Sequence, residues 1–200
     1  MKLRKGDALV VVDVQHDFTD PKGSLYVQGA EKIFPVVRSW INTFAKEKLP
    51  IFFTKDWHPA DHISFKSEEN PSGWPSHCVQ KTWGAEIPEE IPYWRATAYS
   101  RNGQFQSSGT ILKGREQDTD EYSGFAPEDG LGRHLGVFGV RRIFVVGLAT
   151  DYCVKATVLD GLDSGFEVIV VTDAIAGVDV KPGDVDRAIK EMTDAGAKMI

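Results

Sequence analysis

Apolar residues along the chain form short continuous runs that alternate with longer stretches in which they recur at helical spacing. The valine-rich run at 8–14 predicts a buried strand. From 31 to 46, apolar side chains recur every three or four residues, which predicts an amphipathic helix. The same reasoning predicts further strands at 50–54, 110–113, 142–147, 167–172 and 197–200, and further helices at 131–138, from 153 to a stop at Gly165, and at 185–195.

This order of elements predicts the fold class. Strands that alternate with helices imply parallel pairing, so we expect an α/β fold with a doubly wound, mostly parallel sheet of about six strands and helices on both faces. The segment 58–106 breaks the pattern, with several tryptophans among prolines and glycines. A long irregular stretch inside a compact domain is usually functional. We therefore expect one domain over 1–200, with a metal and substrate loop region around 57–106.

Composition narrows the class of protein. The chain has 200 residues, 42% of them hydrophobic, and a formal net charge of −6 without a long basic run. These values are typical of a globular domain and argue against nucleic-acid or anionic-membrane partners. The apolar runs are too short to span a bilayer, and the first one breaks at Asp13, so we expect no signal peptide. Two cysteines make no secreted disulfide framework, and we expect a cytoplasmic protein.

Polar residues follow several of the predicted strands. In open α/β sheets, ligands bind beyond the carboxyl ends of the strands. The first strand ends at Asp13, the second at Asp56 and the third at Lys113, and the fourth runs through a glycine-containing turn into Cys153. We therefore expect two acids, a lysine and a cysteine at one edge of the sheet.

A cysteine nucleophile is one interpretation of this group. Cys153 opens a predicted helix, where the macrodipole favours a thiolate and free backbone N–H groups can hold an oxyanion. Asp13 could then act as general base and acid, and the charge of Lys113 would support both groups. The alternatives are a buried structural cysteine, a turn aspartate and a surface lysine, and each residue taken alone permits them.

The segment after the second strand predicts a metal site. Asp56, His58 and His62 lie within seven residues, and His77 follows in the same loop region. One carboxylate and two imidazoles suit a divalent zinc, iron or manganese ion with open positions for a ligand. We rank Asp56, His58 and His77 first and His62 second. The alternative is a surface loop that happens to contain histidines.

Aromatic residues near these positions could form the walls of a pocket. Phe18, Trp74, Tyr122 and Tyr152 could enclose a flat aromatic substrate. Each of them could equally belong to the hydrophobic core.

The same residues lie in motifs that occur in a fixed order. The motifs are Val12-Asp13-Val14-Gln15-His16-Asp17-Phe18, Thr54-Lys55-Asp56-Trp57-His58-Pro59, Trp74-Pro75-Ser76-His77-Cys78, Lys113-Gly114 and Gly147-Leu148-Ala149-Thr150-Asp151-Tyr152-Cys153-Val154. Over nearly the whole chain, this set resembles the isochorismatase-like cysteine hydrolases, and within them the nicotinamidase/pyrazinamidase branch. The Asp-Trp-His and Trp-Pro-x-His-Cys motifs are specific to that branch, whereas the Asp, Lys and Cys motifs belong to the wider superfamily.

The resemblance implies roles for these residues. It implies a catalytic triad of Asp13, Lys113 and Cys153. It also implies one divalent metal ion on Asp56, His58 and His77, with His62 a further ligand in some members.

The resemblance also implies the shape of the pocket. The Leu148–Ala149 peptide should be cis, so that the N–H groups of Ala149 and Cys153 form an oxyanion hole. Phe18 and Trp74 match positions that sandwich a pyridine ring in the family.

The activity that the resemblance implies is hydrolysis of nicotinamide to nicotinate and ammonia through a cysteine thioester, in NAD salvage, with pyrazinamide as a second substrate. The expected partner is therefore a small aromatic amide, and homo-oligomers occur in this fold. The alternatives are another amide or carbamoyl hydrolase or a vinyl-ether hydrolase of the superfamily, a non-catalytic binding protein of this fold, and a metal hydrolase with a structural cysteine.

Overall fold

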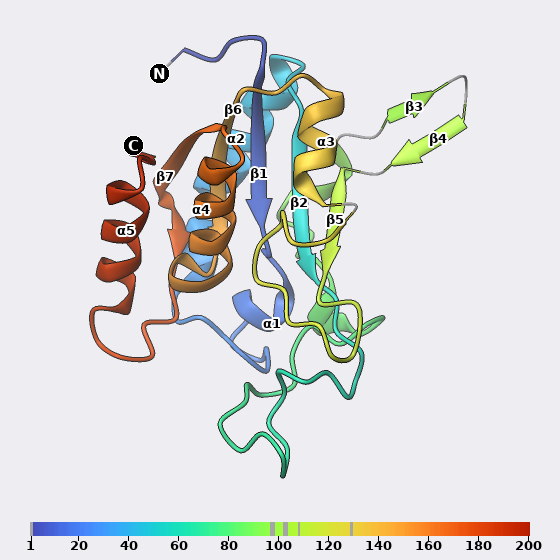
Figure 1. The fold of residues 1–200 in the computed structure, drawn as a ribbon, viewed down its shortest axis with the longest axis vertical. Helices are drawn as coiled ribbons and strands as arrows, with labels where there is room; N and C mark the ends of the chain where they lie inside the picture. The colour runs from blue at the N-terminus through green and yellow to red at the C-terminus, as the bar shows by residue number, and fades with distance from the viewer. Residues whose placement is uncertain (1, 97–98, 102–103, 108, 129) are drawn as a thin grey trace.

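The computed structural model describes residues 2–96, 99–101, 104–107, 109–128 and 130–200. Its centre is a six-stranded sheet in the order β5-β2-β1-β6-β7-β8, in which every described pairing is parallel (Figure 1). The strands are β1 (Asp7–Val12), β2 (Ile51–Asp56), β5 (Thr110–Lys113), β6 (Arg142–Leu148), β7 (Glu167–Ala176) and β8 (Lys198–Met199). The predicted fold class is thus confirmed.

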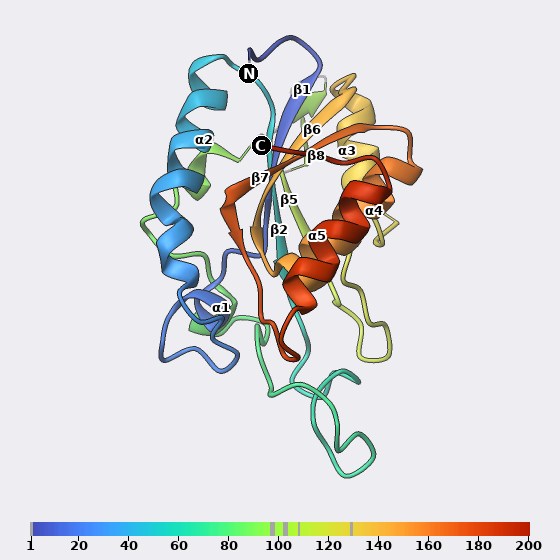
Figure 2. The same cartoon turned by 90° about the vertical axis from the view of Figure 1, so that its left-hand side faces the viewer.

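Helices cover both faces of the sheet (Figure 2). The helices are α1 (His16–Thr19), α2 (Phe34–Lys46), α3 (Leu131–Val137), α4 (Lys155–Asp163) and α5 (Asp184–Asp194). Successive side chains of a strand point to opposite faces. Leu9 and Val11 of β1 therefore pack in one core with α2, whereas Val10 packs in the other core with α3, α4 and α5. Burial on both faces explains why these strands are continuous apolar runs.

Several element boundaries differ from the sequence-based predictions. The first strand ends at Val12, because Asp13 adopts a left-handed conformation with φ of 46° that turns the chain. The predicted helix at 31–46 is a 3₁₀ turn, η1 (Ala30–Ile33), followed by α2. The helix predicted to begin at Cys153 is preceded by a π-helical turn, η4 (Thr150–Val154). The predicted strand at 167–172 extends to Ala176 as β7.

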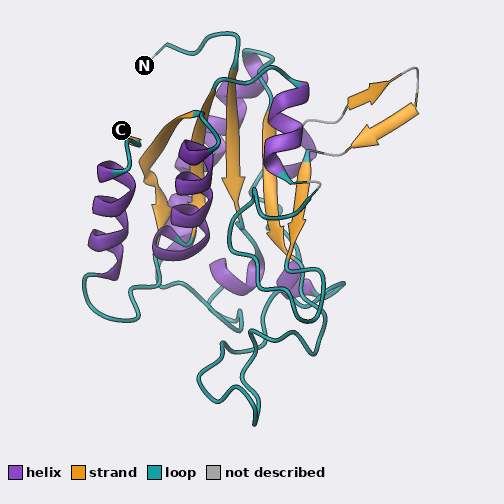
Figure 3. Ribbon diagram, viewed as in Figure 1, coloured by secondary structure: helices purple, strands orange, loops and turns teal. Residues whose placement is uncertain are grey.

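The segment 57–106 is mostly loop, and its loops extend beyond the carboxyl ends of the strands (Figure 3). It contains two short 3₁₀ turns, η2 (Trp83–Ala85) and η3 (Tyr93–Arg95). It also contains an antiparallel hairpin that the sequence pattern does not predict, β3 (Tyr99–Arg101) with β4 (Gln104–Ser107), which projects from the sheet (Figure 1). Residues 97–98 and 102–103 of this segment lie outside the described residues.

Within the described part of the chain, no helix has both the length and the apolar character needed to cross a membrane.

Candidate active site

The predicted polar residues lie at one edge of the sheet, at or after the ends of four neighbouring strands. Asp13 directly follows β1, Asp56 ends β2, Lys113 ends β5, and Cys153 lies in the η4 turn after β6. The strand order β5-β2-β1-β6 places these ends side by side. The carboxyl-end rule therefore located these side chains correctly.

Lys113 lies at the centre of the group. Its side chain is fully buried, and its Nζ lies 2.7 Å from Asp13 Oδ2 and 3.3 Å from Cys153 Sγ, and also contacts Asp56 Oδ1. Burial by itself would lower the pKa of this ammonium, but the two carboxylates raise the pKa well above its ordinary value. Lys113 is therefore a permanent positive charge between the acids and the thiol.

Asp13 has the properties of a base that works near neutral pH. Burial, together with the Asp56 charge, raises the pKa of its carboxyl to about 6 against the opposing effect of Lys113. Thr54 Oγ1 donates a hydrogen bond of 2.6 Å to Asp13 Oδ1, which holds the carboxylate in place. A pKa in this range suits proton transfer to and from a substrate.

Cys153 is buried beside these groups. The sequence predicted that a helix N-terminus would favour its thiolate, but the structure differs. Burial raises the pKa of the Cys153 thiol well above its ordinary value, and Lys113 only partly opposes this effect. The ligand-type atoms of Asp13, Asp56 and Cys153 lie within 4.8 Å of one another. A thiol that needs a base therefore has Asp13 close by.

The turn before Cys153 has the expected backbone. The Leu148–Ala149 peptide is cis, and Ala149 lines the same pocket as Cys153. The N–H groups of these two residues remain the predicted oxyanion hole.

Asp56, His58 and His77 form a second buried cluster, which shares Asp56 with the group around Lys113. Their candidate ligand atoms lie within 4.8 Å of one another, with the Nε2 atoms of His58 and His77 at 3.8 and 4.0 Å from Asp56 Oδ2. The Nδ1 atoms lie 3.0 Å from the Gly114 carbonyl oxygen and 2.8 Å from the Pro75 carbonyl oxygen. Since a carbonyl only accepts, each Nδ1 carries the proton and each Nε2 lone pair faces Asp56.

This donor set fits a divalent metal ion. Burial lowers the pKa of His77, which keeps the imidazole neutral as metal binding requires. Burial alone would raise the pKa of Asp56, but Lys113 and His58 hold it well below its ordinary value, so the carboxylate stays charged. A carboxylate and two neutral imidazoles are ligands typical of zinc, iron(II) or manganese.

His62 lies outside this cluster. Its ring packs against His58 with centroids 4.2 Å apart. Its Nδ1 hydrogen-bonds with Ser64 Oγ at 2.7 Å, and its Nε2 lies 3.0 Å from the Thr119 carbonyl oxygen. Both ring nitrogens are therefore bound to protein atoms, so His62 supports His58 by packing and is not a ligand in this geometry.

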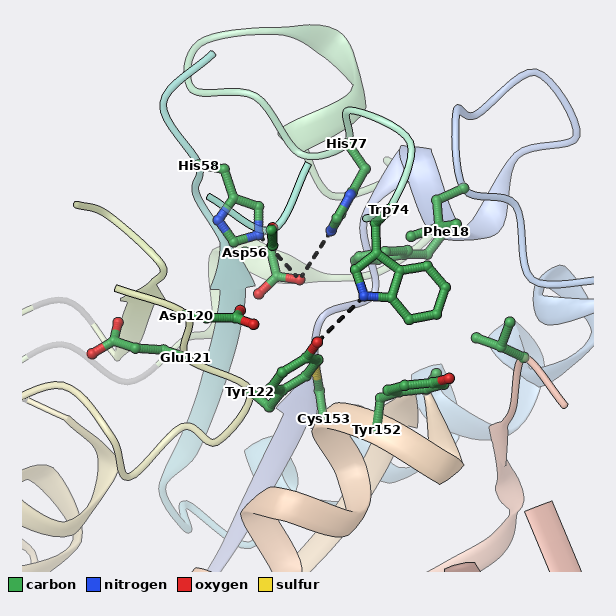
Figure 4. A pocket seen from close by; sticks show the side chains of 14 residues that line it. Phe18, Asp56, His58, Trp74, His77, Asp120, Glu121, Tyr122, Tyr152 and Cys153 are labelled. Carbon is green, nitrogen blue, oxygen red and sulfur yellow. Dashed lines mark hydrogen bonds and ion pairs between the residues drawn. The ribbon is translucent and has the colours of Figure 1, made fainter. Parts of the chain in front are cut away.

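The predicted aromatic side chains all line the pocket between the two groups (Figure 4). Trp74 Nε1 donates to the Tyr122 hydroxyl at 3.3 Å, and the Trp74 ring meets the Tyr152 ring edge-on with centroids 5.1 Å apart. Phe18 packs on the His77 ring at 5.5 Å between centroids. The cavity is therefore lined by the Cys153 thiol, by the carboxylate–imidazole cluster close to it and by flat apolar walls.

Other residues of this pocket were not predicted. Leu25, Ser64, Asp120, Glu121 and Val178 also line it. All of them lie in loops outside the motifs, so no periodicity or strand end could have identified them.

Three comparisons place this architecture among known proteins. A nicotinamidase of Acinetobacter baylyi is 35% identical over 219 aligned positions, which cover 100% of this chain and 94% of that protein. The crystal structure of a pyrazinamidase of Pyrococcus horikoshii in complex with zinc is 42% identical with a TM-score of 0.81, over 98% of both chains. The structure of PnC1 from L. infantum in complex with nicotinate is 32% identical with a TM-score of 0.82, over 98% of this chain and 92% of that one.

The description of the matching family model agrees with the fold and with these relatives. The isochorismatase domain model matches residues 7–102 and 118–200, which is most of the chain. The match includes Asp13, Asp56 and Cys153, and its gap contains the whole of β5 with Lys113. On the fold, the family model and the relatives together, this chain belongs to the isochorismatase family.

Proposed function

We propose that this protein hydrolyses nicotinamide to nicotinate and ammonia through a cysteine thioester. The observation that carries the proposal is the contact of Lys113 with both Asp13 and Cys153, at the base of an aromatic-walled pocket. The nicotinamidase and pyrazinamidase relatives support the same reaction. Such an enzyme is an amidohydrolase that acts on a carboxamide C–N bond, and its product would enter NAD salvage.

The first half-reaction forms the thioester. Asp13 takes the Cys153 proton, and the sulfur forms a bond to the carboxamide carbon. The N–H groups of Ala149 and Cys153 donate to the oxyanion, where one such donor is typically worth about 3 kcal/mol. Asp13 then returns the proton to the amine as the C–N bond breaks, and ammonia leaves. Lys113 keeps its charge throughout and stabilises the sulfur and the carboxylate.

The second half-reaction releases the acid. Asp13, again a carboxylate, takes a proton from a water molecule as the water oxygen attacks the thioester carbon. The C–S bond breaks, and the Cys153 sulfur recovers the proton from Asp13. Nicotinate leaves, and the enzyme returns to its starting state. A base with a pKa of about 6 suits both proton transfers.

The chain's own residues would orient the ring. Asp56, His58 and His77 would hold one divalent ion, zinc, iron or manganese. When bound, this ion supplies a coordination position for the pyridine nitrogen. Phe18 and Trp74 would enclose the ring faces, with the aromatic pair Tyr122 and Tyr152 behind Trp74. Pyrazinamide has a ring of the same shape, so we expect it to be hydrolysed as well.

Ammonia release from nicotinamide by purified protein tests the proposal. We expect release by the wild type and none by Cys153→Ala, whereas Cys78→Ala is the matched control because Cys78 is buried outside the pocket. Mass spectrometry after reaction with iodoacetamide should show the modification on Cys153. Turnover by Cys153→Ala, or no release by wild type supplied with zinc, iron or manganese, would contradict the assignment.

The positions of the pocket residues indicate how much of the chain the active site needs. Residues that line the pocket run from Phe18 to Val178. We infer that residues 1–200 act as one catalytic domain, and that a piece beginning after Phe18 or ending before Val178 would lack part of the pocket.

A further inference from the structure

The short helix α1 is hydrogen-bonded to both chain segments that carry the candidate metal ligands. It has four residues and follows directly after Gln15. It also carries Phe18, which lines the pocket. Of its two buried polar residues, Thr19 donates to the Gln15 carbonyl at 2.9 Å, whereas Asp17 has no role in the proposed chemistry, so the burial of Asp17 needs a separate explanation.

Gln15 ties the Asp56 backbone to this helix. Its Oε1 accepts from the Asp56 N–H at 2.8 Å, and its Nε2 donates to the Asp56 carbonyl at 2.7 Å. The Gln15 side chain is fully buried. Both backbone groups of the carboxylate ligand are thus held by one side chain, and the position of Asp56 is fixed relative to α1.

Asp17 ties the His77 segment to the same helix. Its Oδ2 accepts from the backbone N–H of Cys78 at 2.7 Å, and its Oδ1 accepts from the Ser24 N–H at 3.1 Å. Cys78 directly follows His77 and has φ of 46°, a conformation that non-glycine residues rarely adopt. The Cys78 carbonyl in turn accepts from the His58 N–H at 3.1 Å. Both backbone groups of Cys78 are therefore held next to the cluster.

Gly84 of η2 lies directly against the Asp17 carboxylate. A Cβ atom built on Gly84 of η2 would lie 2.0 Å from Asp17 Oδ2. Glycine at this position therefore lets the carboxylate approach the Cys78 N–H, and a larger residue would displace it.

We propose that Asp17 is a positioning residue that sets the place of His77 relative to Asp56, and thereby the affinity of the site for a divalent ion. The inference rests on the metal site of the proposed function. Hydrogen bonds from N–H groups to a carboxylate are about twice as strong as neutral ones. Asparagine offers one carbonyl oxygen and an NH₂ group, so it cannot accept from both N–H groups in the same geometry.

The experiment measures zinc affinity in metal-free protein by competition with a chromogenic chelator. Loss of an outer-shell contact typically weakens metal binding by about 10- to 100-fold. We expect the zinc dissociation constant of Asp17→Asn to rise by about this factor, and excess zinc to restore occupancy. Gly84→Ala should have the same effect, since its methyl group would displace the same carboxylate. If thermal unfolding shows that one variant is not folded, the zinc affinity of the other variant tests the proposal.

The matched control is Asp20→Asn. Asp20 caps the same helix and accepts from the Lys22 N–H at 2.8 Å on the surface. Its variant should bind zinc as the wild type does. Wild-type affinity in Asp17→Asn, an equal loss in Asp20→Asn, or no zinc binding by the wild type would overturn the proposal. Because no substrate is present, this result is independent of whether the protein releases ammonia from nicotinamide.

Discussion

Replacing Thr54 by valine tests whether Asp13 is the base. The Thr54 hydroxyl donates a 2.6 Å hydrogen bond to Asp13 Oδ1, and both residues are fully buried. Valine has nearly the same shape but no hydroxyl, so the variant removes one stabilising contact of the carboxylate. The charge of Lys113 beside Asp13 is unchanged.

The size of the effect follows from that contact. A hydrogen bond to a charged group contributes about 1.5–3 kcal/mol. Since about 1.4 kcal/mol corresponds to one pH unit, its loss should raise the pKa of Asp13 from about 6 to about 7–8. A raised pKa leaves less of the basic form at low pH. At pH 6 the variant should therefore keep only about 1–10% of Asp13 as carboxylate, against half in the wild type, whereas at pH 9 the two should nearly agree.

The assay is the pH dependence of kcat/KM for nicotinamide. We expect activity to be lost as pH falls through the pKa of Asp13, and the acid limb of Thr54→Val to lie about one to two pH units above that of the wild type. Thr157→Val is the matched control, because the buried Thr157 hydroxyl accepts from the Gly124 N–H at 3.1 Å away from the acids. Its acid limb should not move. A uniform loss of activity at all pH values in Thr54→Val would refute the reasoning.

Three further results are expected. Arg142→Met should lower the free energy of unfolding by about 3–5 kcal/mol in urea titration, because it removes the guanidinium that binds the buried Asp7 carboxylate at 2.7 and 2.8 Å. Activity should not be lost, since both residues lie at the amino ends of their strands, away from the site. A change under 1 kcal/mol would contradict this. Tyr122→Phe should raise KM for nicotinamide about 2- to 12-fold with little change in kcat, since it frees Trp74 from a hydrogen bond of about 0.5–1.5 kcal/mol. A chelator should inactivate the enzyme until a divalent ion is added back, and full activity in metal-free protein would exclude the metal site.

Much of the fold could be predicted because the central strands are buried on both faces. The sequence of β6, Arg142–Leu148, is almost wholly apolar, and its pattern alone predicts a strand. The helix α1 could not be predicted, since four residues are too few to show a helical period. The strands of the hairpin, β3 and β4, have three and four residues, which are too few to show an alternating pattern.

The residues of the candidate site that lie at strand ends could be predicted from the sequence. Asp56 and Lys113 each end a strand, so the topology of a parallel sheet brings them together. The state of the Cys153 thiol was not predictable, because burial raises the pKa of this thiol and only the folded chain sets burial. The part played by His62 depends on its contacts with Ser64 and Thr119, which come from separate segments.

The reacting groups and most of the side chains that contact the substrate ring are held by different elements. Lys113 belongs to β5, two strands away from β1, and strands lie about 4.8 Å apart, so only a long side chain spans β2 to reach Asp13. The reacting groups are thus attached to the sheet or to the turns directly after its strands. Two of the walls that meet the substrate ring, Trp74 and Tyr122, belong to loops, where insertions and exchanges are tolerated. Exchanging the loops around Trp74 and Tyr122 is therefore a route to new amide substrates that leaves Asp13, Lys113 and Cys153 in place.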